Sequence, residues 1–167
     1  MDKNIIVANN IRSAYNVGSL FRICDAFNFN LIIQGISPRP TLPGDIGKDL
    51  IKNLENEKKI KKGGLDGFNN IDWLYFETTE QTIQHLLNQN YEILSIENNI
   101  GNEKLLNKYK FESIKKYAII LGSEVDGVSK QFIEASKDIL FIPMYGYGKS
   151  LNVSITAGIV AYLVNNK

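Results

Sequence analysis

The segment Tyr117-Ala-Ile-Ile-Leu121 is a near-continuous apolar run, and the polar stretch Gly122-Ser-Glu-Val-Asp-Gly-Val-Ser129 follows it directly. An apolar run of this kind is typical of a strand that is covered on both faces, as in the parallel sheets of α/β proteins. Shorter apolar runs predict further strands on either side of it, at residues 5–8, 31–35, 73–76, 91–96 and 139–142. The segment therefore predicts a mostly parallel sheet.

Helical patterns alternate with these strands. Apolar residues recur at intervals of three and four from Asn16 to Phe27, and the same spacing predicts helices that begin at Thr78 or Thr79, at Ser129 and near Leu151. The connection from residue 97 to about 115 is polar and predicts no regular element. Because strands and helices alternate without a repeat or linker, we expect one α/β domain with flanking helices over residues 1–167.

Composition excludes several classes of protein. The 167 residues are 44% hydrophobic and 22% charged, and 19 Lys and Arg against 18 Asp and Glu leave a net charge of +1. A near-neutral chain does not bind DNA through a global positive field. One cysteine and one histidine exclude an internal disulfide, a cysteine-based zinc cluster and a His-rich metal site. With no apolar segment long enough for a membrane span or signal peptide, we expect a cytoplasmic protein without membrane or metal partners.

Three loops occupy the positions where parallel sheets bind ligands. Ligands of such sheets lie beyond the carboxyl ends of the strands, where loops lead into helices. Residues 10–22, 121–129 and 142–154 have this position. Each combines glycines, which let backbone approach a ligand, with Ser, Asn, Glu or Arg side chains that can contact one. These loops therefore hold the candidate site.

Gly148-Lys149-Ser150 is similar to the end of a phosphate-binding P-loop, G-x-x-x-x-G-K-[ST]. Pro143 stands where that pattern needs its first glycine, and proline lacks the N–H that a phosphate cradle uses. No predicted strand follows to supply an aspartate for magnesium. A nucleotide-binding enzyme that uses this segment is therefore the less favoured alternative.

Together the three loops resemble the motifs of the SpoU (TrmH-type) branch of the knotted SPOUT methyltransferases. The matching segments are Asn16-x-Gly18-x-x-x-Arg22, Gly122-x-Glu124-x-x-Gly127-x-Ser129 and Ile142-Pro143-Met144-x-Gly146-x-x-x-Ser150-Leu151-Asn152-Val153-Ser154. The resemblance spans nearly the whole chain. It implies an α/β fold with a C-terminal trefoil knot, S-adenosyl-L-methionine (SAM) as cofactor, a homodimer, and methylation of a ribose 2′-hydroxyl in tRNA or rRNA.

The resemblance also implies roles for individual residues. Arg22 is the catalytic arginine that meets the target ribose and its phosphate, Asn16 supports it or the substrate, and Glu124 anchors the loops. Ser150 and Asn152 lie beside the cofactor and the ribose. The implied cofactor pocket consists of Ile96, Leu121, Gly122, Ile142, Met144 and Leu151. Because arginine is protonated at neutral pH, either Arg22 or an RNA phosphate could accept the hydroxyl proton.

The catalytic candidates also have structural interpretations. Arg22 could form a surface salt bridge, and Glu124 could be a solvated loop acid. Asn16 could be the N-cap of its helix, and Ser150 could cap the last helix with Asn152 in its first turn. The motif context favours the functional roles.

Some conspicuous residues outside the motifs are predicted to be structural. We expect Cys24 to pack in the core, Trp73 to lie in the core and His85 to stand alone on a polar helix face. Tyr145 and Tyr147 flank a glycine, and they could stack on a base or pack locally.

RNA contacts outside the motifs are predicted at Arg12, at Arg39 and along the segment from Lys48 to Lys62, whose tandem lysines could form a mobile loop. A catalytically silent RNA-binding relative is the alternative from another class.

Overall fold

The computed structural model describes residues 3–98 and 100–166, and within them the chain forms a seven-stranded sheet of order β3-β2-β1-β6-β4-β7-β5. Every pair of neighbouring strands is parallel, which confirms the predicted sheet. The strands are β1 (Ile5–Asn9), β2 (Asn30–Gln34), β3 (Trp73–Phe76), β4 (Tyr91–Ile96), β5 (Lys104–Leu105), β6 (Lys116–Leu121) and β7 (Asp138–Phe141). The apolar segment 117–121 lies in β6, between β1 and β4, and is buried along its whole length.

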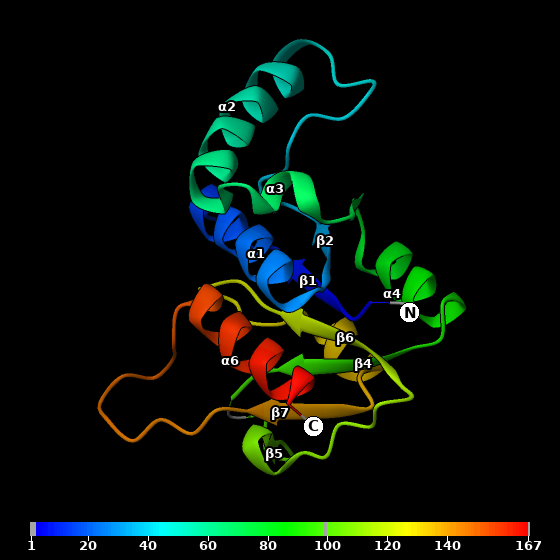
Figure 1. Cartoon of the computed structure of the whole chain (residues 1–167), viewed down its shortest axis with the longest axis vertical. Coiled ribbons are helices and arrows are strands. Elements are labelled where there is room, and N and C mark those ends of the chain that lie inside the picture. Colours follow the sequence, from blue (N-terminus) through cyan, green and yellow to red (C-terminus); the bar gives the residue numbers. More distant parts are fainter. Residues whose placement is uncertain (1–2, 99, 167) are drawn as a thin grey trace.

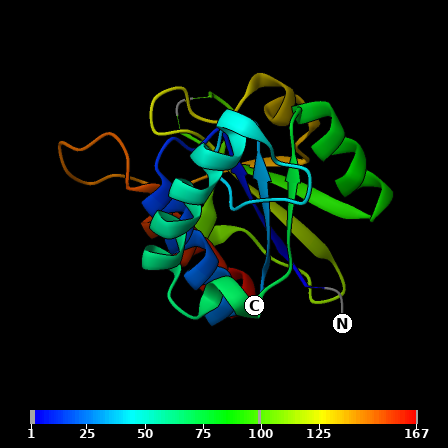
Figure 2. The same cartoon turned by 90° about the horizontal axis from the view of Figure 1, so that it is seen from above.

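Helices cover both faces of the sheet (Figures 1 and 2). On one face lie α1 (Ala14–Phe27), α2 (Gly47–Gly64), the short α3 (Gly67–Asn70) and α6 (Val153–Asn165), and on the other lie α4 (Thr79–Asn88) and α5 (Lys130–Ala135). Each face has its own apolar core. Phe21 and Val160 belong to the first, and Leu86 and Phe132 to the second. Burial on both faces explains why the central strands read as continuous apolar runs.

The predicted order of strands and helices is confirmed, with three additions. The polar connection between β4 and β6 contains β5, which pairs with β7, and a 3-10 helix at Leu106–Lys108. A strand of two residues is too short to produce a periodic pattern, so sequence could not reveal it. The second addition is α2, which spans the whole segment from Lys48 to Lys62, and the third is the short α3.

Helix α2 packs closely against α1 at a contact between glycines. A Cβ built on Gly18 would lie 2.5 Å from the carbonyl oxygen of Ile60 and 3.1 Å from the Cα of Gly63. Ile60 is completely buried, whereas Lys58, Lys59 and the other lysines of the helix are exposed. The tandem lysines thus lie on a packed helix, and the prediction of a mobile loop is wrong because Ile60 and the glycines fix the segment to α1.

The proline-rich loop before α2 is held by an ion pair. Arg39 donates two hydrogen bonds, of 2.8 and 2.6 Å, to the carboxylate of Asp45, and their side chains are only 15% and 8% exposed. The guanidinium also lies 4.8 Å from the centre of the Tyr75 ring. Hydrogen bonds from Arg39 hold the pKa of Asp45 far below its usual range. The structure therefore gives Arg39 a structural role, and with its guanidinium engaged by Asp45 it shows no free cation for the predicted RNA contact.

A second carboxylate joins this loop to α2. Glu57 accepts hydrogen bonds from the N–H and the hydroxyl of Thr41, at 3.0 and 2.6 Å, and from Lys61 at 2.6 Å. Burial raises the pKa of Glu57, but the bonds from Lys61 and Thr41 outweigh it and lower the pKa to about 2.

The residues predicted to be structural occupy such positions. Cys24 is completely buried, and burial raises the pKa of its thiol, which makes it unreactive. Trp73 is partly buried and meets Phe21 edge to face, with 6.1 Å between ring centroids. His85 is half-buried and packs on Phe76, so the prediction that it stands alone on a polar helix face is wrong. Within the described residues no helix is long and apolar enough to cross a membrane.

Candidate functional site

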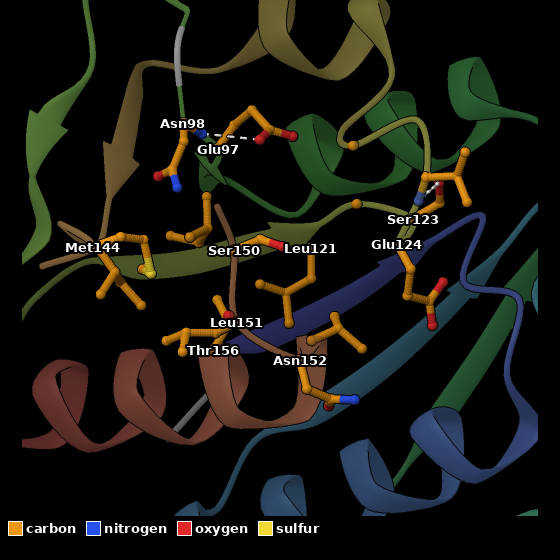
Figure 3. Close-up of a pocket in the computed structure, with 16 residues that line it drawn as sticks. Glu97, Asn98, Leu121, Ser123, Glu124, Met144, Ser150, Leu151, Asn152 and Thr156 are labelled. Atoms are coloured by element: carbon orange, nitrogen blue, oxygen red, sulfur yellow. Dashed lines mark hydrogen bonds between the residues drawn. The ribbon is translucent and has the colours of Figure 1, made fainter. Parts of the chain in front are cut away.

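A cavity of about 460 Å³ lies where the carboxyl ends of β4, β6 and β7 meet. Figure 3 shows the loops after these strands converging on it. Every residue predicted to bind the cofactor lines it, namely Ile96, Leu121, Gly122, Ile142, Met144 and Leu151. Glu124, Ser150 and Asn152 line it too. Residues far apart in the sequence are thus gathered because their parallel strands end at one edge of the sheet.

The wall between β6 and β4 depends on a glycine. A Cβ on Gly122 would collide with the backbone of Gly127 and Val128, so only glycine fits this turn. The Val128 N–H donates a 2.9 Å hydrogen bond to the carboxylate of Glu97, which follows β4. Glu97 also accepts a 2.9 Å bond from the N–H of Asn98. This carboxylate therefore ties the turn after β6 to the end of β4.

Three side chains meet at the rim of the cavity. Asn16 donates through its amide to Glu124 at 2.6 Å, and Asn152 donates to the carbonyl oxygen of the Asn16 side chain at 3.3 Å. The backbone N–H of Arg12 donates to the second Glu124 oxygen at 3.2 Å. One residue from each predicted motif thus forms a continuous chain of hydrogen bonds across α1, the β6 loop and the start of α6.

The caps of α1 and α6 differ from those considered from sequence. Ser13, not Asn16, is the N-cap of α1 and accepts from the Asn16 N–H. Asn152, not Ser150, is the N-cap of α6, with its side-chain oxygen accepting from the Ser154 N–H at 2.9 Å. Ser13 thereby leaves the Asn16 amide free for Glu124, and Ser150 lies in the cavity wall two residues before the cap.

The charge of Glu124 is stabilised where it stands. Partial burial raises the pKa of its carboxyl, but hydrogen bonds from its own N–H, the Asn16 amide and the Arg12 N–H, with the Arg12 charge, outweigh burial and lower the pKa below its usual value. The Arg12 guanidinium forms an exposed ion pair with Asp126 at 3.0 Å. Glu124 is therefore an exposed loop acid, as its structural interpretation has it, but its carboxylate is also held by the bonds from Asn16 and Arg12.

Arg22 is the one catalytic candidate that neither lines the cavity nor joins the hydrogen bonds at its rim. Arg22 is exposed on α1, six residues after Asn16. Along an α-helix this separation places it about 9 Å from Asn16 along the axis and about 120° around the helix from it. It does not line the cavity. It shares an exposed face of α1 with Tyr15, seven residues earlier. The structure thus turns Arg22 away from the cavity of its own chain.

Several cavity residues were not predicted. Glu97 and Asn98 directly follow β4, and Thr156 lies one turn into α6. No motif contains Glu97 or Asn98. Only their position after a buried strand, and that of Thr156 in the first turn of a helix, could have indicated that they line the cavity.

Gly148-Lys149-Ser150 does not have the geometry of a P-loop. A P-loop lysine and serine open the following helix, but α6 begins only at Val153, and residues 148–150 lie in irregular backbone. Among the described residues no group of three or more His, Cys, Asp or Glu side chains could hold a metal ion.

Comparison with known proteins agrees with this geometry. Residues 49–162 match the model of the family described as SpoU rRNA Methylase family. A tRNA (guanosine(18)-2'-O)-methyltransferase of Aquifex aeolicus is 26% identical over 162 residues, which are 95% of this chain and 66% of the relative. The chain thus spans just under two thirds of that relative's length.

Solved structures share the fold. The A. aeolicus TrmH/SpoU tRNA modifying enzyme superposes with a TM-score of 0.77 at 20% identity, over 99% of this chain and 75% of the other. The SpoU methyltransferase AviRb of Streptomyces viridochromogenes, in complex with AdoMet, gives a TM-score of 0.76 at 16% identity, over 99% of this chain and 57% of the other.

Proposed function

We propose that this chain, which belongs to the SpoU rRNA Methylase family, transfers a methyl group from SAM to a ribose 2′-hydroxyl of tRNA or rRNA. The observation that carries the proposal is the single cavity lined by residues of motifs two and three, with Asn16 of motif one bonded at its rim. The A. aeolicus relative is named for this reaction on tRNA. The trefoil knot and the extent of the domain over residues 1–167 stay part of this proposal.

The cavity suits SAM in size and chemistry. Its 460 Å³ lies within the range of about 300–1,000 Å³ of small-molecule sites. Ile96, Leu121 and Ile142 offer apolar walls to an adenine ring, while the carboxylates of Glu97 and Glu124 favour a cation. When bound, SAM supplies an electrophilic methyl group on a positively charged sulfur.

The residues at the rim have the task of holding the acceptor ribose. Glu124 fixes the Asn16 amide, and Asn16 in turn accepts from Asn152, so these side chains are oriented before RNA arrives. Arg22 binds the phosphate beside the target ribose through its planar guanidinium, which suits bidentate phosphate binding. Bringing hydroxyl and methyl group into line is the main contribution required of the protein.

The orientation of Arg22 supports action between two copies. Helix α6 exposes Ile155, Ile159 and Tyr162 at intervals of four and three, which make an apolar stripe on one helix face. Exposed apolar surface of this kind marks an interaction site. We infer a homodimer that covers this stripe, and in it Arg22 serves the cavity of the partner.

The first experiment is calorimetric titration with SAM and with S-adenosylhomocysteine, with ATP and magnesium as control. Binding of SAM but not ATP supports the proposed pocket. Unmodified tRNA and rRNA transcripts are then incubated with SAM that carries a labelled methyl group. Arg22→Ala should bind SAM normally and transfer no methyl. RNA binding without SAM binding or transfer would instead identify a catalytically silent relative.

A mixing experiment tests the dimer. Arg22→Ala and Asn152→Ala damage different halves of the proposed shared site, so mixed dimers contain one intact site. Mixing the two inactive variants should restore part of the activity. Light scattering should show a dimer for the wild-type chain and a monomer for Ile159→Glu. Full activity of a monomer would refute this arrangement.

A further inference from the structure

Two tyrosines stand fully exposed on the loop that joins β7 to α6. Tyr145 is 94% exposed and Tyr147 is exposed over its entire surface. Neither has a hydrogen bond or ring contact to another residue in the described part of the chain. Both views show this loop extending away from the body of the molecule (Figures 1 and 2). Two aromatic rings held in water offer a large surface to a ligand.

The base of this loop belongs to the candidate site. Met144, directly before Tyr145, lines the cavity, and so does Ser150, three residues after Tyr147 (Figure 3). Both ends of the loop that carries the rings therefore lie in the wall of the cavity. A ribose that approaches a methyl group in the cavity brings its base and its neighbours to this loop.

The composition of the loop points to RNA instead of a protein surface. Between Met144 and Leu151 it contains no aliphatic side chain, and the exposed Lys149 adds a positive charge beside the rings. The stripe on α6, with Ile155 and Ile159, has the opposite character. Aromatic rings interspersed with cations are typical of surfaces that bind single-stranded nucleic acid, where bases stack on the rings.

Glycines allow the rings to move to their ligand. A Cβ on Gly146 or on Gly148 would meet no atom within 4 Å, so neither glycine is required by close packing. Glycine next to each ring leaves the backbone free to orient the ring against a base.

From these observations we propose that Tyr145 and Tyr147 stack on unpaired bases next to the target ribose, with Lys149 on the adjoining phosphate. This inference rests on the proposed function and adds to it the substrate class, an RNA loop or single strand. Stacking needs bases that are turned out of a helix, so a fully paired duplex cannot use the tyrosines.

The test compares two double variants. Tyr145→Ala with Tyr147→Ala removes the rings, whereas Tyr145→Phe with Tyr147→Phe keeps the stacking surface and loses only the hydroxyls. Affinity is measured by fluorescence anisotropy with a labelled RNA stem-loop and with a fully paired duplex. The alanine variant should bind the stem-loop at least about tenfold more weakly, and the phenylalanine variant as wild type does. Affinity for the duplex should not change.

Other outcomes overturn the inference. Unchanged binding of the stem-loop by the alanine variant would do so, as would an equal loss for stem-loop and duplex. If the alanine variant keeps its RNA affinity but loses SAM affinity or the dimer, the rings cover the cofactor or a second copy. The proposed function fails separately, when wild-type protein transfers no methyl group to any RNA. If wild type methylates RNA and the alanine variant has the same KM for it, only the stacking inference fails.

Discussion

Replacing Gly18 by alanine should destabilise the protein, although the same change usually stabilises a helix. Gly18 lies inside α1, and alanine in a helix interior is favoured over glycine by about 1 kcal/mol. Here the added methyl group would lie 2.5 Å from the Ile60 carbonyl oxygen and 3.1 Å from both the Gly63 Cα and the Gly64 nitrogen. These are backbone atoms, so they cannot rotate away, and α2 must move as a whole.

The size of the effect follows from that movement. Non-bonded carbon atoms rest at about 3.5–4.0 Å, so the helices must separate by about 1 Å at this contact. Overpacking of this kind costs about 1–3 kcal/mol, and the rigid contact argues for the upper end. Subtracting about 1 kcal/mol of helix propensity leaves a loss of about 2 kcal/mol. For a chain of this length the melting temperature should fall by about 4–8 °C.

Gly158→Ala is the matched control. Gly158 lies inside α6 on the face of the proposed dimer contact, and within the chain no atom is within 4 Å of a Cβ built there. In the Ile159→Glu background, which removes that contact, this variant should gain up to about 1 kcal/mol. Urea unfolding of both variants and the wild type, at one protein concentration, gives the free energies of unfolding. If Gly18→Ala is as stable as Gly158→Ala, the close α1–α2 contact carries no energy and the reasoning is wrong.

Three further predictions concern charge. Replacing Lys58, Lys59 and Lys62 by glutamine should weaken RNA binding. The slope of the logarithm of the binding constant against the logarithm of the salt concentration should become shallower by about 0.7–0.9 per lost phosphate contact. An unchanged slope would show that these lysines do not contact RNA phosphates. Because the pKa of Glu57 is lowered to about 2, its carboxylate stabilises the fold above its usual pKa of 4.5 and loses this effect as pH falls toward 2. The Glu57→Gln variant should therefore lose less stability than the wild type as the pH falls. The difference in that loss, measured as the free energy of urea unfolding across acidic pH, should be on the order of 2 kcal/mol. The coupling free energy between Asn16→Ala and Glu124→Ala should be about 1 kcal/mol in a double-mutant cycle, and a value near zero would show that their 2.6 Å bond does not form in solution.

The sequence by itself determined the α/β class and the three loops that hold the site. Both depend on local signals. A strand buried on two faces must be apolar along its length, as β6 is, and ligand-binding loops of a parallel sheet must follow such strands. The assignment of Leu121, Ile142 and Leu151 to one cofactor pocket came from the resemblance to the SpoU motifs, and the structure places all three in the cavity wall.

Other features depend on contacts between residues whose pairing cannot be predicted from the sequence. The sequence does not show that Arg39 is structural, because its partners Asp45 and Tyr75 are identified only in the folded chain. The lysine-rich segment becomes a packed helix because Ile60 and two glycines meet Gly18 on α1, a contact with no periodic signature. Ser13 takes the cap position that Asn16 could also have filled.

The rim of the site shows the same division. The bond between Asn16 and Glu124 spans 108 positions, and it exists because β1 and β6 are neighbours in the sheet. Both residues were predicted as site residues from the sequence. Only the tertiary structure shows that they bond to each other and that Arg22 lies on another face of α1. The sequence specifies the side chains, whereas the distances between them depend on which strands pair and which helix faces are buried.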